Sequence, residues 1–307
     1  MSELVGTGSS AAWSGGESGQ PHGAADTAFA VGRSCGETAR LQRQAEELAP
    51  ESRVLLERTA LGLGQRAIDV GCGPRGILET LVEFVGPAGR VVGLDSDPAL
   101  IELAMRFAAE RGWDNVELIC ADARHSGLPS DTFDVVHART LLIGLSQPAE
   151  VLTELVRLTR PGGWVVGMEP DAEHPDAEHL VCHPPHPAVD RLSELLTRAL
   201  TRRGADPHLG RRLAELYRQA GLNDVTVEVR APVHPPGHSR RTNLTDLVRS
   251  LRAPILGLGL ASERELEELD ASAREHLTKP DTLVIPDLFF LARGRKSSRS
   301  RVGPPGS

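Results

Sequence analysis

Short apolar runs alternate along the chain with longer amphipathic stretches. Runs rich in Val, Ile and Leu predict buried strands, and stretches with apolar residues three and four positions apart predict helices. Proline and glycine mark several element ends, as where Pro98 opens one helix and Gly112 follows its last residue. Strands are predicted at 66–70, 90–94, 116–120, 133–137, 164–169, 224–233 and 282–292. Helices are predicted at 36–49, 51–61, 76–85, 98–111, 148–160, 188–203, 207–220, 240–256 (as far as Pro254) and 262–277.

This alternation of strands and helices predicts the α/β fold class. Each helix would cross over between two parallel strands, and such crossovers are nearly always right-handed. The pattern is most regular over 63–169. Two insertions in the second half, 170–206 and 234–280, are expected to form a lid and a substrate-side wall. The predicted division is a disordered tail at 1–27, a helical cap at 28–62, the core at 63–169, the lid at 170–206, the rest of the core at 207–293 and a basic disordered tail at 294–307.

The composition narrows the class of protein. The chain has 307 residues and a formal net charge of −8, with 40% apolar and only 3% aromatic residues, so Leu, Val, Ala and Ile must fill its core. No apolar run reaches the roughly 18 residues of a membrane span, and no signal-peptide segment precedes Arg33. An acidic chain poor in aromatic residues is a poor nucleic-acid binder. Four cysteines without a CxxC pair favour a reducing cytoplasm.

The segment DVGCGPRG at 69–76 carries the strongest chemical signal. It follows a predicted strand, where glycines allow a sharp turn and a close approach of the backbone to a ligand. Read literally, Gly71, Gly73 and Gly76 also match the dinucleotide fingerprint. Asp69 argues against a nicotinamide cofactor, because a carboxylate there would repel a pyrophosphate but suits a cationic amino-acid group.

Acidic residues stand at the ends of three successive predicted strands, namely Asp69, Asp95 and Asp122. The carboxyl ends of parallel strands meet at one edge of a sheet, so these carboxylates are expected to face one crevice. Asp95 can accept hydrogen bonds from two ribose hydroxyls. Asp122, with the backbone N–H of Ala123, can bind the edge of an adenine. Any one of them could instead be a helix cap, but the set together indicates a nucleoside site.

These segments resemble the class I S-adenosylmethionine-dependent methyltransferases, of the ubiquinone/menaquinone type that acts on small molecules. The resemblance covers about residues 30–235 and implies a Rossmann-like sheet of seven strands with the last antiparallel, a helical N-terminal cap and lid insertions. It also implies S-adenosyl-L-methionine as the cofactor. The matching motifs are DVGCGPRG at 69–76, VVGLDSDP at 91–98, CADARHSGLP at 120–129, FDVVHART at 133–140 and LTRPGGWVV at 158–166.

The resemblance implies a role for each cofactor-site residue. The backbone of Gly71, Cys72 and Gly73 would pack against the methionine part of the cofactor, with Asp69 near its ammonium group. The other contacts implied are Asp95 and Ser96 at the ribose, Asp122 and Ala123 at the adenine, Ala138 and Arg139 at the sulfonium and methionine moiety, and Arg40 of the cap.

Two positions depart from the family pattern. Arg75 replaces the third glycine of the usual DxGxGxG motif, and Gly76 follows one place later. If position 75 needed a positive φ, arginine would cost about 1 kcal/mol there, and the shifted glycine can relieve that strain. Gly144 stands where relatives often carry a histidine, so no role of that histidine can be transferred.

Candidates for a general base follow the fifth predicted strand. Methyl transfer is an in-line displacement at a sulfonium, so the protein chiefly holds the acceptor in line, although some acceptors also need a base. Glu169, Asp171 and His174 are expected near the crevice mouth, and Asp171 and His174 are the catalytic candidates. The alternative for His174 is a surface loop residue. His137 is expected to lie buried beside the sheet.

The first insertion contains a run of possible metal ligands. His179, Cys182, His183 and His186 have spacings that a zinc ion could use, but no second cluster completes a metal pattern. Neighbouring prolines restrict the backbone. We therefore expect a rigid lid without a metal.

The sequence thus predicts a cytoplasmic methyltransferase acting on a small-molecule acceptor in specialised (natural-product) metabolism. His137-Ala138-Arg139 stands where base-methylating relatives often carry an Asn/Asp-Pro-Pro-aromatic tetrad, so neither nucleic acid nor membrane is an expected partner. Homo-oligomerisation and the acceptor atom (O, N or C) stay open. Three alternatives remain: a protein that binds S-adenosylmethionine but catalyses cyclisation or decarboxylation, a nicotinamide-dependent enzyme, and a binding module without catalysis.

Overall fold

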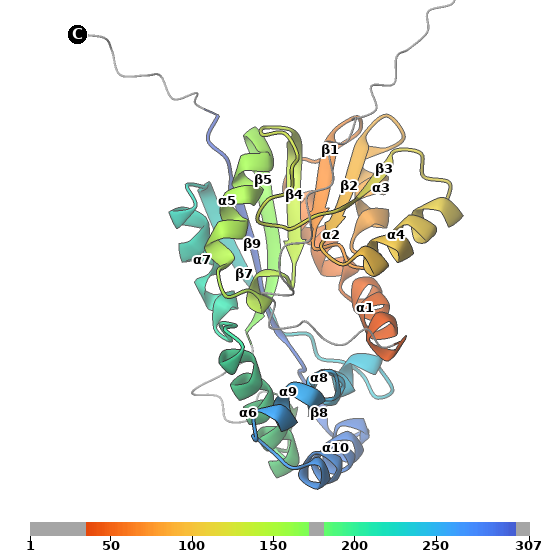
Figure 1. Ribbon diagram of the computed structural model, residues 1–307, viewed down its shortest axis with the longest axis vertical. Coiled ribbons are helices and arrows are strands. Elements are labelled where there is room, and N and C mark those ends of the chain that lie inside the picture. Colours follow the sequence, from red (N-terminus) through yellow and green to blue (C-terminus); the bar gives the residue numbers. More distant parts are fainter. Residues whose placement is uncertain (1–34, 172–180, 299–307) are drawn as a thin grey trace, which may run out of the picture.

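The computed structural model describes residues 35–171 and 181–298. The predicted tail at 1–27 and two candidate residues, His174 and His179, lie outside these ranges. Figure 1 shows a twisted sheet with helices on both sides and, beyond one end of its strands, a lobe built mainly from helices.

A seven-stranded sheet forms the core of the fold. The strands are β1 (Arg66–Val70), β2 (Arg90–Asp95), β3 (Val116–Cys120), β4 (Phe133–Arg139), β5 (Thr159–Asp171), β7 (Asn223–Arg230) and β9 (Leu288–Arg295). Their order is β3-β2-β1-β4-β5-β9-β7. The first five run parallel, and β9 pairs antiparallel with both β5 and β7. The prediction of seven strands with the last one antiparallel is confirmed.

Helices cover both faces of the sheet, because its central strands are apolar on both sides. They are α2 (Ala49–Glu57), α3 (Leu78–Val85), α4 (Pro98–Glu110), α5 (Pro148–Leu158) and α7 (Leu209–Gln219). On one face α2, α3 and α4 pack with Val91 and Val135 of the sheet. On the other face α5 and α7 pack with Ile68 and Val136. The sheet is therefore the middle of three layers, and its strand ends are left for other contacts.

The two insertions fold together into one lobe. It comprises β6 (Cys182–His183), α6 (Pro187–Arg202), α8 (Asn243–Ser250), α9 (Arg252–Gly257), α10 (Glu263–Thr278) and β8 (Leu283–Val284). Strand β6 pairs antiparallel with β8. The apolar faces of the helices meet in a separate core that includes Leu192, Val248 and Leu277. Within the described ranges, no helix combines the length and the apolarity needed to cross a bilayer.

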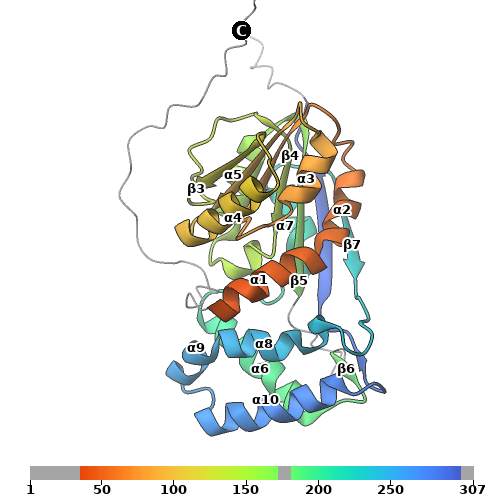
Figure 2. The same ribbon diagram turned by 90° about the vertical axis from the view of Figure 1, so that its right-hand side faces the viewer.

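Helix α1 (Cys35–Glu47) lies between the sheet and the lobe (Figure 2). Its Glu37 accepts a hydrogen bond of 2.7 Å from the hydroxyl of Ser250 on α8. Its Glu47 accepts one from Ser239, the first residue of the short helix η2 (Ser239–Thr242). The N-terminal helix therefore joins the sheet domain to the lobe.

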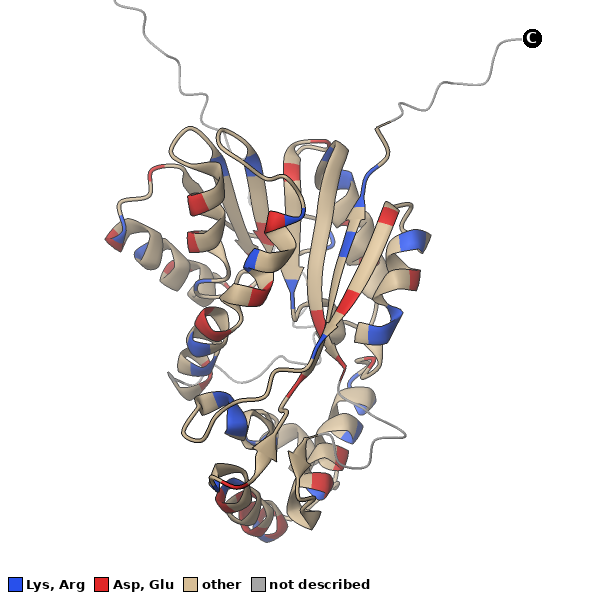
Figure 3. Ribbon diagram, turned by 180° about the vertical axis from the view of Figure 1, so that it is seen from behind, with Lys and Arg blue, Asp and Glu red and all other residues tan. Residues whose placement is uncertain are grey.

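Charged residues of both signs are interspersed on the helices (Figure 3). Many of them form ion pairs within one helix, such as Arg198 with Glu194 at 3.0 Å. Such exposed pairs contribute little stability individually. The cores of the sheet and the lobe therefore carry most of the folding free energy.

Several predicted strands have different bounds in the structure, and the extensions of β5 and β9 have one shared cause. Strand β5 begins at Thr159 and not at residue 164, because Gly162 and Gly163 exchange backbone hydrogen bonds with Lys296 at 3.0 and 2.9 Å. The same contact extends β9 to Arg295, so the first residues of the predicted tail at 294–307 belong to the sheet. No local pattern indicates this pairing, since the partners are far apart in the chain.

Two prolines have roles that differ from the predictions. Pro286 divides the single strand predicted at 282–292, so that β8 joins the lobe and β9 joins the sheet. A proline has no N–H to donate to a strand ladder, which accounts for the break. Pro254 does not end a helix: the helix breaks at Leu251, and Pro254 lies in the first turn of α9, where a proline is tolerated.

Arg241 provides a test of what stabilises the lobe. Its buried guanidinium donates to the carbonyl oxygens of His234, Leu277, Lys279 and Thr282. Arg241→Met keeps an aliphatic stem but leaves these acceptors unsatisfied, and each such group costs about 1–3 kcal/mol. We expect the free energy of unfolding in urea to fall by at least about 3 kcal/mol.

The matched control is Arg249→Met, which removes a guanidinium that is 54% exposed and paired with Asp270. This change should alter the free energy of unfolding by less than about 1 kcal/mol. Equal losses in the two variants would show that the buried hydrogen bonds of Arg241 do not stabilise the lobe.

Candidate functional site

The carboxyl ends of four parallel strands bring the predicted site residues to one edge of the sheet. Asp69 lies opposite Gly93 of β2 and His137 of β4 in the strand register, and Asp95 lies opposite Cys120 of β3. The loops that follow these strands therefore lie side by side. Ligands of open α/β sheets bind at such an edge.

The glycine turn after β1 presents open backbone. Gly71, Gly73 and Gly76 all have positive φ, at 75°, 57° and 52°. A Cβ atom on Gly73 would meet no atom within 4 Å, so the backbone there is accessible to a ligand. Arg75 does not have a positive φ, and Gly76 takes that conformation in its place. The departure from the family pattern at position 75 is therefore accommodated without strain.

Asp69 lies beneath this turn and not in the open space above it. Its Oδ2 accepts a hydrogen bond of 2.9 Å from the backbone N–H of Ile77, and its Oδ1 lies 2.7 Å from Nδ1 of His137. A Cβ on Gly76 would come within 2.0 Å of Oδ2, so the turn closes directly over the carboxylate. The place of Asp69 near a ligand ammonium group stays a prediction. The prediction that His137 is buried is confirmed.

Asp95 holds the glycine turn from the neighbouring strand. Its Oδ2 accepts a hydrogen bond of 2.8 Å from the N–H of Gly73, and its Oδ1 accepts one of 2.9 Å from Asp97. Burial raises the pKa of the Asp95 carboxyl group, although these two hydrogen bonds act in the opposite direction. Ser96 follows directly, and its carbonyl oxygen accepts from the thiol of Cys120. Asp95 thus links β2 to the turn at the predicted ribose position.

Asp122 is exposed after β3, next to the half-buried Ala123. Its carboxylate accepts hydrogen bonds from the backbone N–H of Arg124 at 2.8 Å and from the guanidinium of the same residue at 2.7 Å. The hydrogen bond from the Arg124 side chain lowers the pKa of Asp122 and keeps it ionised. Asp122 is therefore accessible to a ligand, and the Arg124 side chain lies beside its carboxylate.

Arg139 ends β4 after the buried Ala138 and reaches toward the N-terminal helices. Its guanidinium donates to the hydroxyl of Ser52 at 3.2 Å and to the carbonyl oxygen of Ala45 at 3.4 Å. Burial lowers the pKa of Arg139 to about 10, so the group stays protonated at neutral pH. No carboxylate among the described residues lies within ion-pairing distance of it. Arg40, also expected at the site, instead pairs with Glu37 on its own helix at 2.6 Å.

The base candidates Glu169 and Asp171 lie at the end of β5 and have partners within the protein. The Asp171 carboxylate is buried, and Arg211 of α7 donates to it at 2.7 and 2.9 Å. This ion pair holds the Asp171 carboxylate in place at the end of β5, and its catalytic role stays a prediction. Glu169 is fully buried, with its oxygens on backbone N–H groups.

The described residues of the histidine-rich run, Cys182, His183 and His186, lie in the lobe. Cys182 is buried in β6, and His186 caps α6, where its Nδ1 accepts a hydrogen bond of 3.3 Å from Ala188. The ring of His186 stacks on His276 at 4.5 Å between centroids. Among the described residues no group of three or more His, Cys, Asp and Glu side chains is arranged to hold a metal ion.

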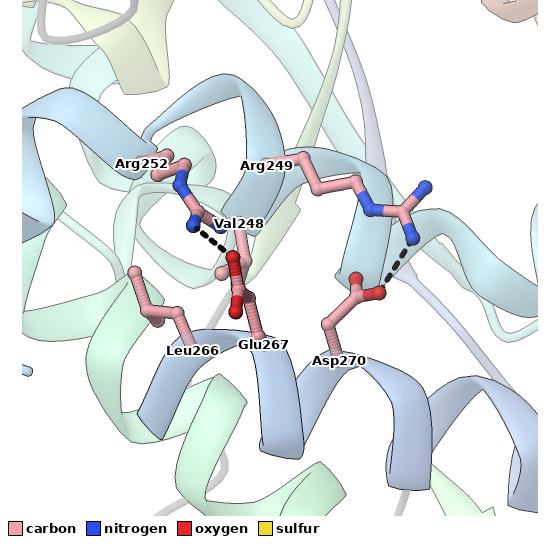
Figure 4. Close-up of a pocket in the computed structure, with 6 residues that line it drawn as sticks. All are labelled: Val248, Arg249, Arg252, Leu266, Glu267 and Asp270. Carbon is pink, nitrogen blue, oxygen red and sulfur yellow. Dashed lines mark hydrogen bonds and ion pairs between the residues drawn. The ribbon is translucent and has the colours of Figure 1, made fainter. Parts of the chain in front are cut away.

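A cavity of about 190 Å³ lies between α8, α9 and α10 in the lobe. Figure 4 shows that its charged side chains face one another, with Arg249 bonded to Asp270 and Arg252 to Glu267. These opposite charges pair with each other, so the cavity lining carries little net charge, and only Oδ1 of Asp270 among its buried polar atoms lacks a hydrogen-bond partner. Its lining residues are Val248, Arg249, Arg252, Leu266, Glu267 and Asp270.

Comparison with known proteins assigns the fold and the site to a family. The methyltransferase domain family matches residues 67–163. A demethylmenaquinone methyltransferase from Halalkalibacterium halodurans is 30% identical over 185 residues, which cover 56% of this chain and 74% of that protein. The aklanonic acid methyltransferase DauC from Streptomyces sp. is 33% identical over 125 residues, 41% of this chain and 57% of that protein. An uncharacterised 37.1 kDa protein of transposon TN4556 from Streptomyces fradiae is 32% identical over 231 residues, 71% of this chain and 61% of that protein.

Solved structures show the same fold at lower identity. The cyclase SpnF superposes with a TM-score of 0.53 and 21% identity over 81% of this chain and 80% of that one. A Haemonchus contortus phosphoethanolamine N-methyltransferase in complex with S-adenosyl-L-methionine superposes with a TM-score of 0.51 and 19% identity. The superposition covers 80% of this chain and 51% of that one.

The chain therefore belongs to the class I S-adenosylmethionine-dependent methyltransferases of the menaquinone type, whose cofactor is S-adenosylmethionine. The matched region spans between 49% and 61% of the length of the first curated relatives. The residues at the sheet edge fit this cofactor, because Gly73 offers open backbone beside the carboxylate of Asp95, and Asp122 is accessible nearby.

Glu169 gives the stability of the protein a specific pH dependence. Burial raises the pKa of its carboxyl group from an ordinary 4.5 to about 7. Between these values the folded chain keeps a proton that the unfolded chain has lost. The contribution of Glu169 to the free energy of unfolding is therefore largest at acidic pH and declines as the pH rises, by up to about 1.4 kcal/mol per unit.

The measurement is urea unfolding of the wild type and Glu169→Gln at several pH values. Glutamine does not titrate, so the free energy of unfolding of the wild type minus that of the variant should fall by about 3 kcal/mol between pH 4.5 and 7.5. Parallel pH profiles would contradict the raised pKa of Glu169.

Proposed function

We propose that the protein transfers a methyl group from S-adenosylmethionine to a small-molecule acceptor. One observation carries the proposal: the open glycine turn at Gly73 is bonded through its N–H to the carboxylate of Asp95 at 2.8 Å. This places open backbone and a strand-end carboxylate side by side, as a nucleoside with an amino-acid tail requires. The family to which the chain belongs supports the same reading.

The residues of the sheet edge would divide the cofactor between them. The backbone of Gly71, Cys72 and Gly73 would pack against its methionine part. The guanidinium of Arg139 would bind the carboxylate of the same methionine moiety, because it has no carboxylate partner among the described residues. Ala138, which precedes it, is buried. The ribose would lie against Asp95 and Ser96, and the adenine against Asp122 and Ala123.

The structure changes the role that we propose for Asp69. Its carboxylate accepts a hydrogen bond from the N–H of Ile77 and lies next to His137. We propose that it supports the glycine turn from below and attracts the ammonium group through its charge. When bound, the cofactor supplies an electrophilic methyl group on a sulfonium. The protein then has to hold an acceptor atom in line with it and exclude water.

The lobe is where we place the acceptor site. It is assembled from both insertions and joined to the sheet domain through α1. Aklanonic acid methyltransferase DauC, a relative by sequence, is named for aklanonic acid. We propose a small-molecule acceptor in specialised metabolism and a cytoplasmic location, with which the free thiols of Cys72, Cys120 and Cys182 are compatible. His174 remains the proposed base for acceptors that need one.

A second candidate keeps the cofactor but not the methylation. The cyclase SpnF has the same fold, and a buried sulfonium can stabilise charge without transferring its methyl group. Mass spectrometry of the products separates the two candidates: a product heavier by one methylene group supports our proposal, and a cyclised or decarboxylated product without that gain in mass supports the second.

Calorimetric titration with S-adenosylmethionine, S-adenosylhomocysteine and NAD tests the cofactor site. We expect the two sulfur nucleotides to bind with micromolar affinity, and NAD not to bind. Asp95→Ala removes both the ribose acceptor and the hydrogen bond to Gly73. It should weaken binding by at least about 10-fold, the effect of one charge-assisted hydrogen bond.

The control is Glu117→Ala on the neighbouring strand β3, where Glu117 pairs with Arg90 at the protein surface. This variant should bind both sulfur nucleotides like the wild type. Binding of NAD, or full affinity in Asp95→Ala, would overturn the proposed site.

A further inference from the structure

We propose that Glu169 is a positioning residue for the cofactor site: its carboxylate anchors the chain after β4, and this places Leu141 against the glycine turn at Gly71. The inference rests on the proposed function, because it concerns the turn that would hold the methionine part of the cofactor. Glu169 acts through the backbone and through Leu141, and it touches neither cofactor nor acceptor.

The anchor consists of three consecutive backbone donors. Oε1 of Glu169 accepts hydrogen bonds from the N–H groups of Leu141 at 3.0 Å and Leu142 at 2.9 Å, and Oε2 accepts one from Ile143 at 3.2 Å. Successive N–H groups that converge in this way form an anion-binding nest. The carboxylate is fully buried. The nest is therefore occupied by an acidic side chain of this protein.

The backbone before the nest takes an unusual conformation to reach it. Thr140 has a φ of 50°, in the left-handed region that residues other than glycine rarely adopt. Its N–H donates to the carbonyl oxygen of Met168 at 2.8 Å, next to Glu169 on β5. The turn is thus bonded to β5 on both sides of the strained residue. Without the carboxylate, the N–H groups that follow would lose the partner that offsets this strain.

Leu141 connects the anchor to the cofactor turn. A Cβ atom placed on Gly71 would lie 3.0 to 3.4 Å from three atoms of the Leu141 side chain, so this side chain packs directly on the turn. On the other side, the N–H groups of Gly71 and Cys72 donate to the carbonyl oxygen of Leu94 at 2.7 and 3.0 Å. The turn is therefore held between β2 and Leu141, and a shift of Leu141 would free one side of it.

The experiment compares three variants of the full chain. At about pH 8.5, above the raised pKa of Glu169, the wild-type side chain is an ionised acceptor, and Glu169→Gln replaces it by an amide whose NH2 group would face a backbone N–H. Leu141→Ala keeps the anchor but removes the contact with Gly71. Asp134→Asn is the matched control, since Asp134 also accepts from a backbone N–H, that of Arg66 at 2.9 Å, at the opposite end of the sheet.

Two measurements are made on each variant. Amide hydrogen exchange, without any nucleotide, reports the protection of residues 141–143. Calorimetry reports the Kd for S-adenosylhomocysteine. For Glu169→Gln we expect both an exchange rate and a Kd that rise by about 10-fold or more, the effect of losing charge-assisted hydrogen bonds. For Leu141→Ala we expect the higher Kd with the protection of Leu142 and Ile143 retained, and for Asp134→Asn neither change.

A merely structural role would lower the thermal stability of Glu169→Gln and leave the Kd of the folded protein unchanged, which would overturn the inference. Wild-type affinity in Leu141→Ala would also overturn it, and this variant decides the question if Glu169→Gln does not fold. Failure of the proposed function has a different signature, because the wild type itself would then bind neither sulfur nucleotide.

Discussion

The buried carboxylate of Asp69 is the interaction on which the cofactor edge of this protein depends. It ends β1, accepts a hydrogen bond from Ile77 at the start of α3, and lies 2.7 Å from Nδ1 of His137 on β4. Two strands and a helix therefore meet at one side chain. This arrangement constrains the glycine turn, because any side chain at position 76 would collide with the carboxylate beneath it.

Two further carboxylates hold backbone around the same turn. Asp95 binds the N–H of Gly73 from β2, and Glu169 binds the N–H groups that follow β4. Buried or partly buried acids of this kind are costly unless backbone donors satisfy them. Where donors are present, the loops become rigid, and a rigid site needs less ordering when a ligand binds. The acidic strand ends thus order the site as well as offering acceptors to a ligand.

Much of the architecture could be predicted from local patterns. The bounds of β1 and β3 agree with the prediction, and α4 begins at Pro98 after its cap Asp97 as predicted. The division of the last predicted strand at Pro286 could not be predicted, because it depends on the pairing of β8 with β6 in the lobe. Likewise, the ion pair between Asp171 and Arg211 of α7 could not be predicted, because the two residues come from separate elements of the chain.

The sequence by itself determined the alternation of strands and helices, the glycine turn and the acidic residues at the strand ends, because these features depend on near neighbours in the chain. Only the tertiary structure decided which acids stay open to a ligand and which become internal supports. Asp122 remains exposed, whereas Asp69 and Glu169 are enclosed. The physical reason is that the environment of a carboxylate is set by donors from distant segments, and those donors are brought together only when the sheet has formed.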